Sequence, residues 1–270
     1  MINTVVTGIT GRMGSTLVRL VRDDADMKLS GATERAGSGA VGLDAGLATK
    51  LGALEVPVVD SLSRALDKAA VVIDFTSAEA SLEHARICAE KNVPLVVGST
   101  GFSAAAKYEM AVFGQKIPIV MAPNMSVGVN LVIQVAGHLA KTLGEAFDVE
   151  IVETHHKMKK DAPSGTALRL AEEIASTTKR SSKDFVMERH GQIGERTRSE
   201  IGIQTLRGGD VVGEHTVYFF GEGERVELTH RATSRDQFGR GALRAAKWVV
   251  GKPPGVYDMM DVLGLKAQKP

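Results

Sequence analysis

Residues 3–14, NTVVTGITGRMG, join a short apolar run to three glycines spaced three apart. The run at residues 3–7 is typical of a buried strand, and apolar residues then recur at helical spacing as far as about residue 21. Glycines at such a turn allow the backbone to approach a pyrophosphate at the N-terminus of the helix. Close packing of the strand against the helix would also explain them, so the turn alone does not decide between the two roles.

The next predicted strand, at residues 28–33, is followed by an acidic and a basic residue. Glu34 stands where a carboxylate binds the adenosine ribose hydroxyls of NAD, and Arg35 can hold the 2′-phosphate of NADP. An exposed ion pair between the two side chains is the alternative. Because the pair follows the glycine turn, we expect a nicotinamide cofactor, NADPH or NADH, with both residues among its contacts.

Strands and helices then alternate through the first half of the chain. Residues 36–54 form a glycine-rich irregular stretch to which we assign no chemistry. The elements expected after it are helices at 61–68, 78–91 and 104–113 and strands at 70–75, 94–98 and 117–121. Such repetition predicts an α/β fold with a Rossmann-type doubly wound parallel sheet. Ligands bind beyond the carboxyl ends of its strands, here at the turns 74–77, 98–101 and 122–126.

The pattern changes after a long predicted helix at residues 127–143. Strand-like stretches follow at 147–152, 185–188, 200–206, 211–220 and 225–232, with hairpin signals at 207–210 and 221–225. We expect a second α+β domain with an open mixed or antiparallel sheet, whose uncovered face or edge favours subunit association. The predicted domains are 1–126, completed by 236–270, for the dinucleotide, and 127–235 for substrate binding and oligomerisation.

A polar connection, ETHHKMKKDAPSGTA at residues 153–167, joins the strand at 147–152 to a predicted helix. Histidine titrates near neutral pH and lysine supplies a positive charge or a proton, so His155 and Lys159 suit proton transfer to an acidic substrate. Pro163 fits the first turn of the helix because its missing N–H is not needed there.

The start of that helix predicts an anion site. Ser164, Gly165 and Thr166 stand where unpaired backbone amides and the helix dipole attract negative charge. A solvated basic loop and a structural metal site are the alternatives for the connection as a whole. Adjacent histidines without a cysteine or a third well-spaced ligand match no usual metal pattern, so we expect no metal.

The composition excludes several classes of protein. With 33 Lys and Arg against 32 Asp and Glu, the formal charge is only +1, so general nucleic-acid binding is not expected. Cys88 is the only cysteine, which excludes an internal disulfide and favours a reducing compartment. The chain begins with a strand instead of a leader, and no apolar run approaches the roughly 20 residues of a membrane span. We therefore expect a cytoplasmic protein that binds neither nucleic acid nor membrane.

The polar connection resembles the signature of one enzyme family. The pattern E-x-H-H-x-x-K-x-D-A-P-S-G-T-A at residues 153–167 is similar to that of the 4-hydroxy-tetrahydrodipicolinate reductases, also called dihydrodipicolinate reductases, of diaminopimelate and lysine biosynthesis. The resemblance implies that His155 is a proton donor or acceptor and that Lys159 donates a proton near the reduced carbon. The implied contacts to the substrate's carboxylates are His156, Ser164, Gly165, Thr166 and Arg235.

The resemblance also implies the cofactor contacts and the assembly. The family has the same glycine spacing and G-R-M-G at residues 11–14. The implied cofactor contacts are Gly8, Ile9, Thr10, Gly11, Arg12, Met13, Glu34, Arg35, Gly98, Ser99, Thr100, Ala122, Pro123, Asn124 and Met125. Relatives often carry an aromatic residue at the position of Met125, so the resemblance implies the site here but not the detailed packing around the nicotinamide ring. The family forms tetramers through the second sheet, and we expect a homotetramer on that basis only.

The expected activity is NAD(P)H-dependent reduction of the cyclic imine formed from 4-hydroxy-tetrahydrodipicolinate to tetrahydrodipicolinate. A non-catalytic regulator that senses the NAD(H) ratio with the same first domain is the alternative, although sensing requires no proton donors beside an anion site. His190, His215 and His230, which are scattered through the second domain, are expected to be structural.

Overall fold

The computed structural model describes residues 1–266, which divide into two compact units. Unit 1 contains Met1–Val127 and the described residues from Asp236 onwards, and unit 2 is Gly128–Arg235. The sequence placed the corresponding divisions after residues 126 and 235. The last four residues of the predicted segment 236–270 lie outside the described residues.

Unit 1 is built on a seven-stranded sheet in which every pair of neighbours is parallel. The strands in spatial order are β12 (Gly255–Tyr257), β6 (Pro118–Met121), β5 (Leu95–Val97), β4 (Val71–Asp74), β1 (Ile2–Thr7), β2 (Met27–Thr33) and β3 (Val58–Val59). The central strands β4 and β5 are buried along their whole length, which explains their continuous apolar runs.

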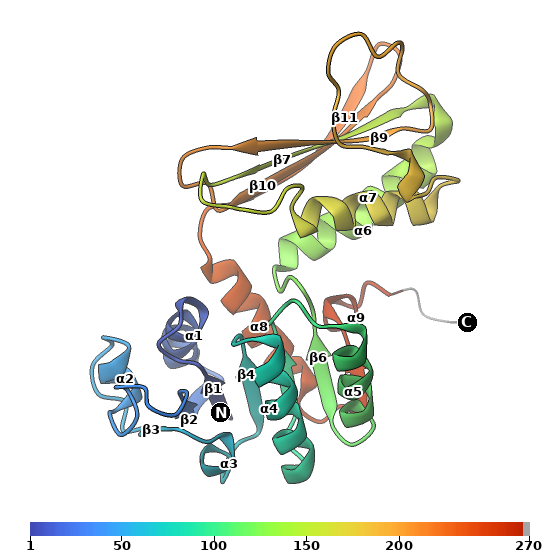
Figure 1. Cartoon of the computed structure of the whole chain (residues 1–270). Helices are drawn as coiled ribbons and strands as arrows, with labels where there is room; N and C mark the ends of the chain where they lie inside the picture. Colours follow the sequence, from blue (N-terminus) through green and yellow to red (C-terminus); the bar gives the residue numbers. More distant parts are fainter. Residues whose placement is uncertain (267–270) are drawn as a thin grey trace. The chain divides into compact units, whose positions relative to one another are not determined.

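Helices cover both faces of this sheet, so the predicted doubly wound fold is confirmed (Figure 1). One apolar cluster packs α1 (Arg12–Asp23), α8 (Asp236–Val249) and α9 (Met259–Leu263) against the strands, and the other packs α3 (Leu62–Ala65), α4 (Ala78–Lys91) and α5 (Ala104–Gly114). The short α2 (Ala45–Ala48) interrupts the stretch that the sequence predicted to be irregular. Strands β3 and β12 were not predicted, because two and three residues are too few to show a period.

Unit 2 is an α+β unit with a mixed sheet of five strands. The strands in spatial order are β11 (Arg225–Ala232), β10 (Gly213–Phe220), β7 (Asp148–His155), β9 (Ile201–Arg207) and β8 (Phe185–Val186). Figure 1 shows α6 (Val127–Leu143) and α7 (Gly165–Thr177) along one face of this sheet. Two 3-10 turns, η1 (Gly144–Ala146) and η2 (Ser182–Asp184), precede β7 and β8.

One of the two predicted hairpins in unit 2 is wrong. The turn at 221–225 does join the antiparallel pair β10 and β11. The turn at 207–210 instead connects β9 to β10 across β7, which lies between them, parallel to β9 and antiparallel to β10. The connection wraps around the end of β7, where the Gly208 N–H donates to the His155 carbonyl at 3.0 Å. The glycines of residues 207–210 were therefore read correctly as a turn, but the turn does not join paired strands.

Candidate active site

The polar connection begins inside a strand and ends at a capped helix. β7 extends to His155, so this histidine is the last residue of the strand and does not lie in a loop. Ser164 caps α7, and its Oγ accepts a hydrogen bond from the Ala167 N–H at 3.2 Å. Pro163 precedes this cap, so the expectation that it occupies the first helical turn was wrong by two positions.

A buried carboxylate organises the end of β7. Alternation along the strand places Glu153 and His155 on the face that also buries Val149 and Ile151. The Glu153 side chain is 0% exposed. Its hydrogen bonds come from His155 Nδ1 at 2.6 Å, the Ser164 N–H at 2.9 Å, Thr205 Oγ1 at 3.3 Å, and Arg207 Nη1 and Nη2 at 2.8 and 2.9 Å.

These partners decide the charge of Glu153. Burial by itself would raise the pKa of this carboxyl, but the hydrogen bonds from His155 and Arg207 outweigh burial and lower the pKa to about 2. The same carboxylate raises the pKa of Arg207. Glu153 is therefore ionised at every pH at which the protein would work, and it is held by a bidentate pair with good geometry.

His215 belongs to the same cluster. It is the register partner of Glu153 on β10, it is 4% exposed, and its Nε2 lies 3.0 Å from Ser164 Oγ. Its ring meets the His155 ring edge to face, with the centroids 5.1 Å apart. Burial, reinforced by the neighbouring His155, lowers the pKa of His215 to about 3. His215 is therefore neutral near pH 7.

Lys159 is tied to this cluster through Asp161. The Lys159 ammonium donates to both carboxylate oxygens of Asp161, at 2.8 and 2.9 Å. Arg207 Nη2, which already donates to Glu153, also donates to the Asp161 carbonyl at 2.8 Å. One guanidinium therefore joins the carboxylate beneath His155 to the segment that carries Lys159.

The residues predicted to contact the substrate's carboxylates differ in burial and in how many of their hydrogen-bonding groups are already paired. Ser164 is buried, and both its N–H and its Oγ are already engaged within unit 2. Gly165 is exposed at the first position of α7, and its N–H has no acceptor among the described residues. Thr166 and His156 are half-buried, and the His156 N–H donates to the Val211 carbonyl at 2.8 Å. Arg235 is exposed at the last position of unit 2.

The predicted cofactor residues lie in unit 1, at the carboxyl ends of its strands. Gly8 has a φ of +60°, and a Cβ at Gly14 would lie 2.0 Å from the Gly8 carbonyl, so the start of α1 approaches the turn closely. Glu34 follows β2 and accepts from the Thr10 N–H at 2.8 Å and from Thr10 Oγ1 at 2.6 Å. These contacts lower the pKa of Glu34 against the opposing effect of burial. Arg35 is exposed beside it.

The two later turns line a cavity of about 620 Å³ within unit 1. Its walls include four of the predicted cofactor residues, Ser99, Thr100, Ala122 and Pro123. Met125 does not line this cavity: its side chain is 1% exposed and belongs to the core that packs α1 and α8 on the sheet. Among the remaining predicted residues, Gly8, Ile9, Gly11, Gly98 and Asn124 lie on the turns themselves, and Arg12 and Met13 are the first two residues of α1.

Two features of other classes of protein are absent from the described residues. Residues 1–266 contain no group of three or more His, Cys, Asp or Glu side chains arranged to hold a metal ion. None of the helices in this range combines the length and apolar character required to cross a membrane.

Comparisons with known proteins identify the family of the chain. Residues 2–125 match the family model described as dihydrodipicolinate reductase, N-terminus, and residues 128–263 match dihydrodipicolinate reductase, C-terminus. The chain belongs to the dihydrodipicolinate reductase family. It is 64% identical over 268 residues to the 4-hydroxy-tetrahydrodipicolinate reductase of Myxococcus xanthus (strain DK1622), with 98% of this chain and 99% of the relative covered.

A second relative and a solved structure extend the match within the dihydrodipicolinate reductase family. The 4-hydroxy-tetrahydrodipicolinate reductase of Anaeromyxobacter dehalogenans (strain 2CP-1 / ATCC BAA-258) is 60% identical over the whole of both chains. The dipicolinate-bound dihydrodipicolinate reductase from Paenisporosarcina sp. TG-14 is 26% identical, with a TM-score of 0.77 and 97% of this chain and 98% of that chain covered. The resemblance and the reductase class are confirmed, and none of these relatives is named as a regulator.

Three residues of the cluster around Glu153 were not among the predicted site residues of this reductase. Glu153 entered only as the first position of the motif at residues 153–167, Arg207 was assigned to a turn, and His215 was expected to be structural. A partial signal for the first was present: the predicted strand ended at residue 152, but if it continues to residue 155, Glu153 and His155 are two residues apart and share a face. The other two come from β9 and β10, and no local pattern indicates that both strands flank β7.

Proposed function

We propose that this protein reduces the cyclic imine formed from 4-hydroxy-tetrahydrodipicolinate to tetrahydrodipicolinate, with NADPH or NADH as the hydride donor. The observation that carries the proposal is the single short connection that bears His155 and Lys159 and ends at the N-terminus of α7, in a chain of the dihydrodipicolinate reductase family. A dicarboxylate that must gain a hydride and a proton needs anion contacts and proton donors together.

The residues of unit 2 divide this work among them. His155 donates or accepts the proton through the ring nitrogen that is not bonded to Glu153, and Lys159 supplies a proton near the reduced carbon. The N-terminus of α7, with Ser164, Gly165 and Thr166, attracts the substrate's carboxylates together with His156 and Arg235. Since Ser164 already bonds to Glu153 and His215, its part is to fix the helix start, and the amide of the exposed Gly165 is the better carboxylate contact.

Unit 1 is proposed to bind the cofactor, which supplies the hydride when bound. The glycine turn and Glu34 are already joined through Thr10, so a carboxylate is held beside the helix N-terminus that faces a pyrophosphate in folds of this class. Arg35 is free to meet a 2′-phosphate, which supports the use of NADPH as well as NADH. We further propose that unit 2 mediates a homotetramer and that the enzyme is cytoplasmic.

Replacing the two proton-handling residues tests the proposal. In His155→Gln and Lys159→Ala, we expect the oxidation of NADPH with freshly made substrate to slow about 100-fold or more, while the Kd for NADPH stays within twofold. Lys157→Ala, an exposed lysine in the same segment, is the matched control and should keep wild-type turnover. Unchanged turnover in both test variants would refute the roles. A protein that binds NADPH but never oxidises it would be a sensor instead of an enzyme.

A further inference from the structure

Glu153 is the most completely buried carboxylate of unit 2, and burying an ionised group is costly unless it is paired. An ion pair with Arg207 alone would meet that need. The carboxylate nevertheless also meets His155, at 2.6 Å from Nδ1, and the proposed reaction assigns no task to that contact. The question is therefore what the contact does to the histidine.

The carboxylate cannot move to follow the imidazole. Both of its oxygens are bound by Arg207, and Oε1 also accepts from the Ser164 N–H at the start of α7. Its position is thus fixed by two elements besides its own strand. The His155 ring, at the end of β7 and 12% exposed, must adjust to the carboxylate.

The chemistry of the contact determines which nitrogen carries the proton. An ionised carboxylate only accepts hydrogen bonds, so Nδ1 of His155 must be the donor. Nε2 is then the nitrogen that can exchange a proton with a substrate, and it is held on the far side of the ring from Glu153. A histidine free to change tautomer would spend part of its time with the wrong nitrogen protonated.

We infer that Glu153, clamped by Arg207, is a positioning residue that fixes the tautomer and the orientation of His155. Glu153 is fully buried and does not touch substrate; it acts through the imidazole. Arg207 extends the same effect to Lys159, because it also holds the Asp161 carbonyl in the segment where Lys159 bonds to Asp161. This inference rests on the proposed role of His155.

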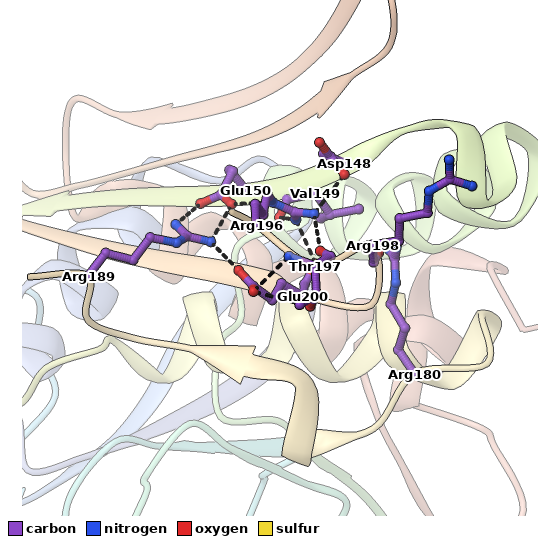
Figure 2. Close-up of polar contacts among 9 residues, drawn as sticks. All are labelled: Asp148, Val149, Glu150, Arg180, Arg189, Arg196, Thr197, Arg198 and Glu200. Carbon is purple, nitrogen blue, oxygen red and sulfur yellow. Dashed lines mark hydrogen bonds and ion pairs between the residues drawn. The ribbon is translucent and has the colours of Figure 1, made fainter. Parts of the chain in front are cut away.

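Glu153→Gln tests it, because the amide keeps the shape of the side chain and removes its charge. We expect kcat to fall about 100-fold, with KM and the Kd for NADPH each within threefold. Glu153→Asp, which restores a carboxylate, should recover part of the lost kcat. The matched control is Glu150→Gln, because Glu150 is on the same strand and is also held by arginines but has no histidine partner (Figure 2).

A direct reading of the tautomer makes the test independent of turnover. In wild-type protein with 15N-labelled histidine, the His155 signals should show the proton on Nδ1, and in Glu153→Gln they should show both tautomers. Wild-type His155 protonated on Nε2 alone would overturn the inference even if Glu153→Gln failed to fold. So would a loss of kcat as large in Glu150→Gln as in Glu153→Gln. If His155→Gln keeps its activity while the tautomer is as expected, the proposed reaction fails and the positioning stands.

Discussion

Two glutamates of β7 show how similar ion pairs serve different ends. Glu150 and Glu153 are three residues apart and so point to opposite faces of the sheet. Each forms a bidentate pair with an arginine at 2.8 and 2.9 Å, Glu150 with Arg189 and Glu153 with Arg207. The bidentate pair is therefore not what distinguishes the candidate active site. The difference is that Glu153 also holds a histidine and the start of a helix.

The network around Glu150 has a structural purpose. Arg196 donates to Glu150 at 3.1 Å and to the carbonyls of Val149 and Glu200 at 3.0 and 2.7 Å, and Arg189 also pairs with Glu200 at 2.9 Å. Figure 2 shows these side chains converging on β7 from the segment that precedes β9. The arginines thereby fasten a segment without regular structure, residues 187–200, to the sheet.

Replacing one arginine in each network should give the largest difference in stability and in kcat between the two faces of the sheet. In Arg207→Gln, the fully buried Glu153 loses its arginine partner, so we expect the free energy of unfolding to fall by about 3 kcal/mol and kcat to fall about 10-fold or more. In Arg189→Gln, Glu150 keeps Arg196, and the loss should be about 1 kcal/mol with kcat unchanged.

Urea unfolding and steady-state kinetics of both variants provide the measurement. Equal losses of stability would mean that burial of the carboxylate does not distinguish the two faces. A fall in kcat for Arg189→Gln would mean that the outer network also supports the reaction.

Acid should lower the stability of the folded protein in two steps, because the groups around Glu153 and Glu150 take up protons over different pH ranges. His215, on the Glu153 side, has its pKa lowered to about 3 in the folded protein, below the unfolded value of about 6.5. The unfolded chain then binds the extra proton, so stability is fully present above pH 6.5 and is lost as the pH falls toward 3. Glu153 and Glu200, one on each network, have pKa values lowered to about 2 and add losses only below about pH 4.5.

The change in unfolding free energy between pH 6.5 and 4.5 therefore tests whether His215 is held neutral in the folded protein. Wild-type protein should lose about 2 to 3 kcal/mol of unfolding free energy across it through this residue, and His215→Gln should remove that loss. Chemical denaturation at several pH values measures both slopes. Identical slopes in the two proteins would show that His215 is not held neutral by its surroundings.

The sequence predicted more of the fold than of the cluster around Glu153. The bounds of α4 and α6 agree with the predicted ranges 78–91 and 127–143, because long helices show their period and Ser77 caps the first of them. His155 and Lys159 were predicted from one local motif. Arg207 and His215 were not, because they reach Glu153 by strand pairing, and the glycines at 208 and 209 indicate a turn without indicating which strands it joins.

Two glycines, Gly202 against Glu150 and Gly213 against His155, should give the smallest difference between the two faces of the sheet. Both allow alanine at their backbone angles, since neither has a positive φ. A Cβ at Gly202 would lie 1.8 Å from Glu150 Oε2, whereas one at Gly213 would lie 3.0 Å from His155 Nε2. Gly202→Ala must displace a paired carboxylate, so we expect a loss of about 1 to 3 kcal/mol of stability and an unchanged kcat.

Gly213→Ala should instead lower kcat and cost little stability. The His155 ring has to move by only a few tenths of an ångström to relieve the contact, which costs little stability, but the nitrogen proposed to exchange the proton is the one displaced. A shift of that size in a reacting group lowers kcat about threefold. Thermal unfolding and kcat, measured together on the two variants, decide the matter: if Gly213→Ala loses stability and keeps its rate, the position of Nε2 is not what limits the reaction.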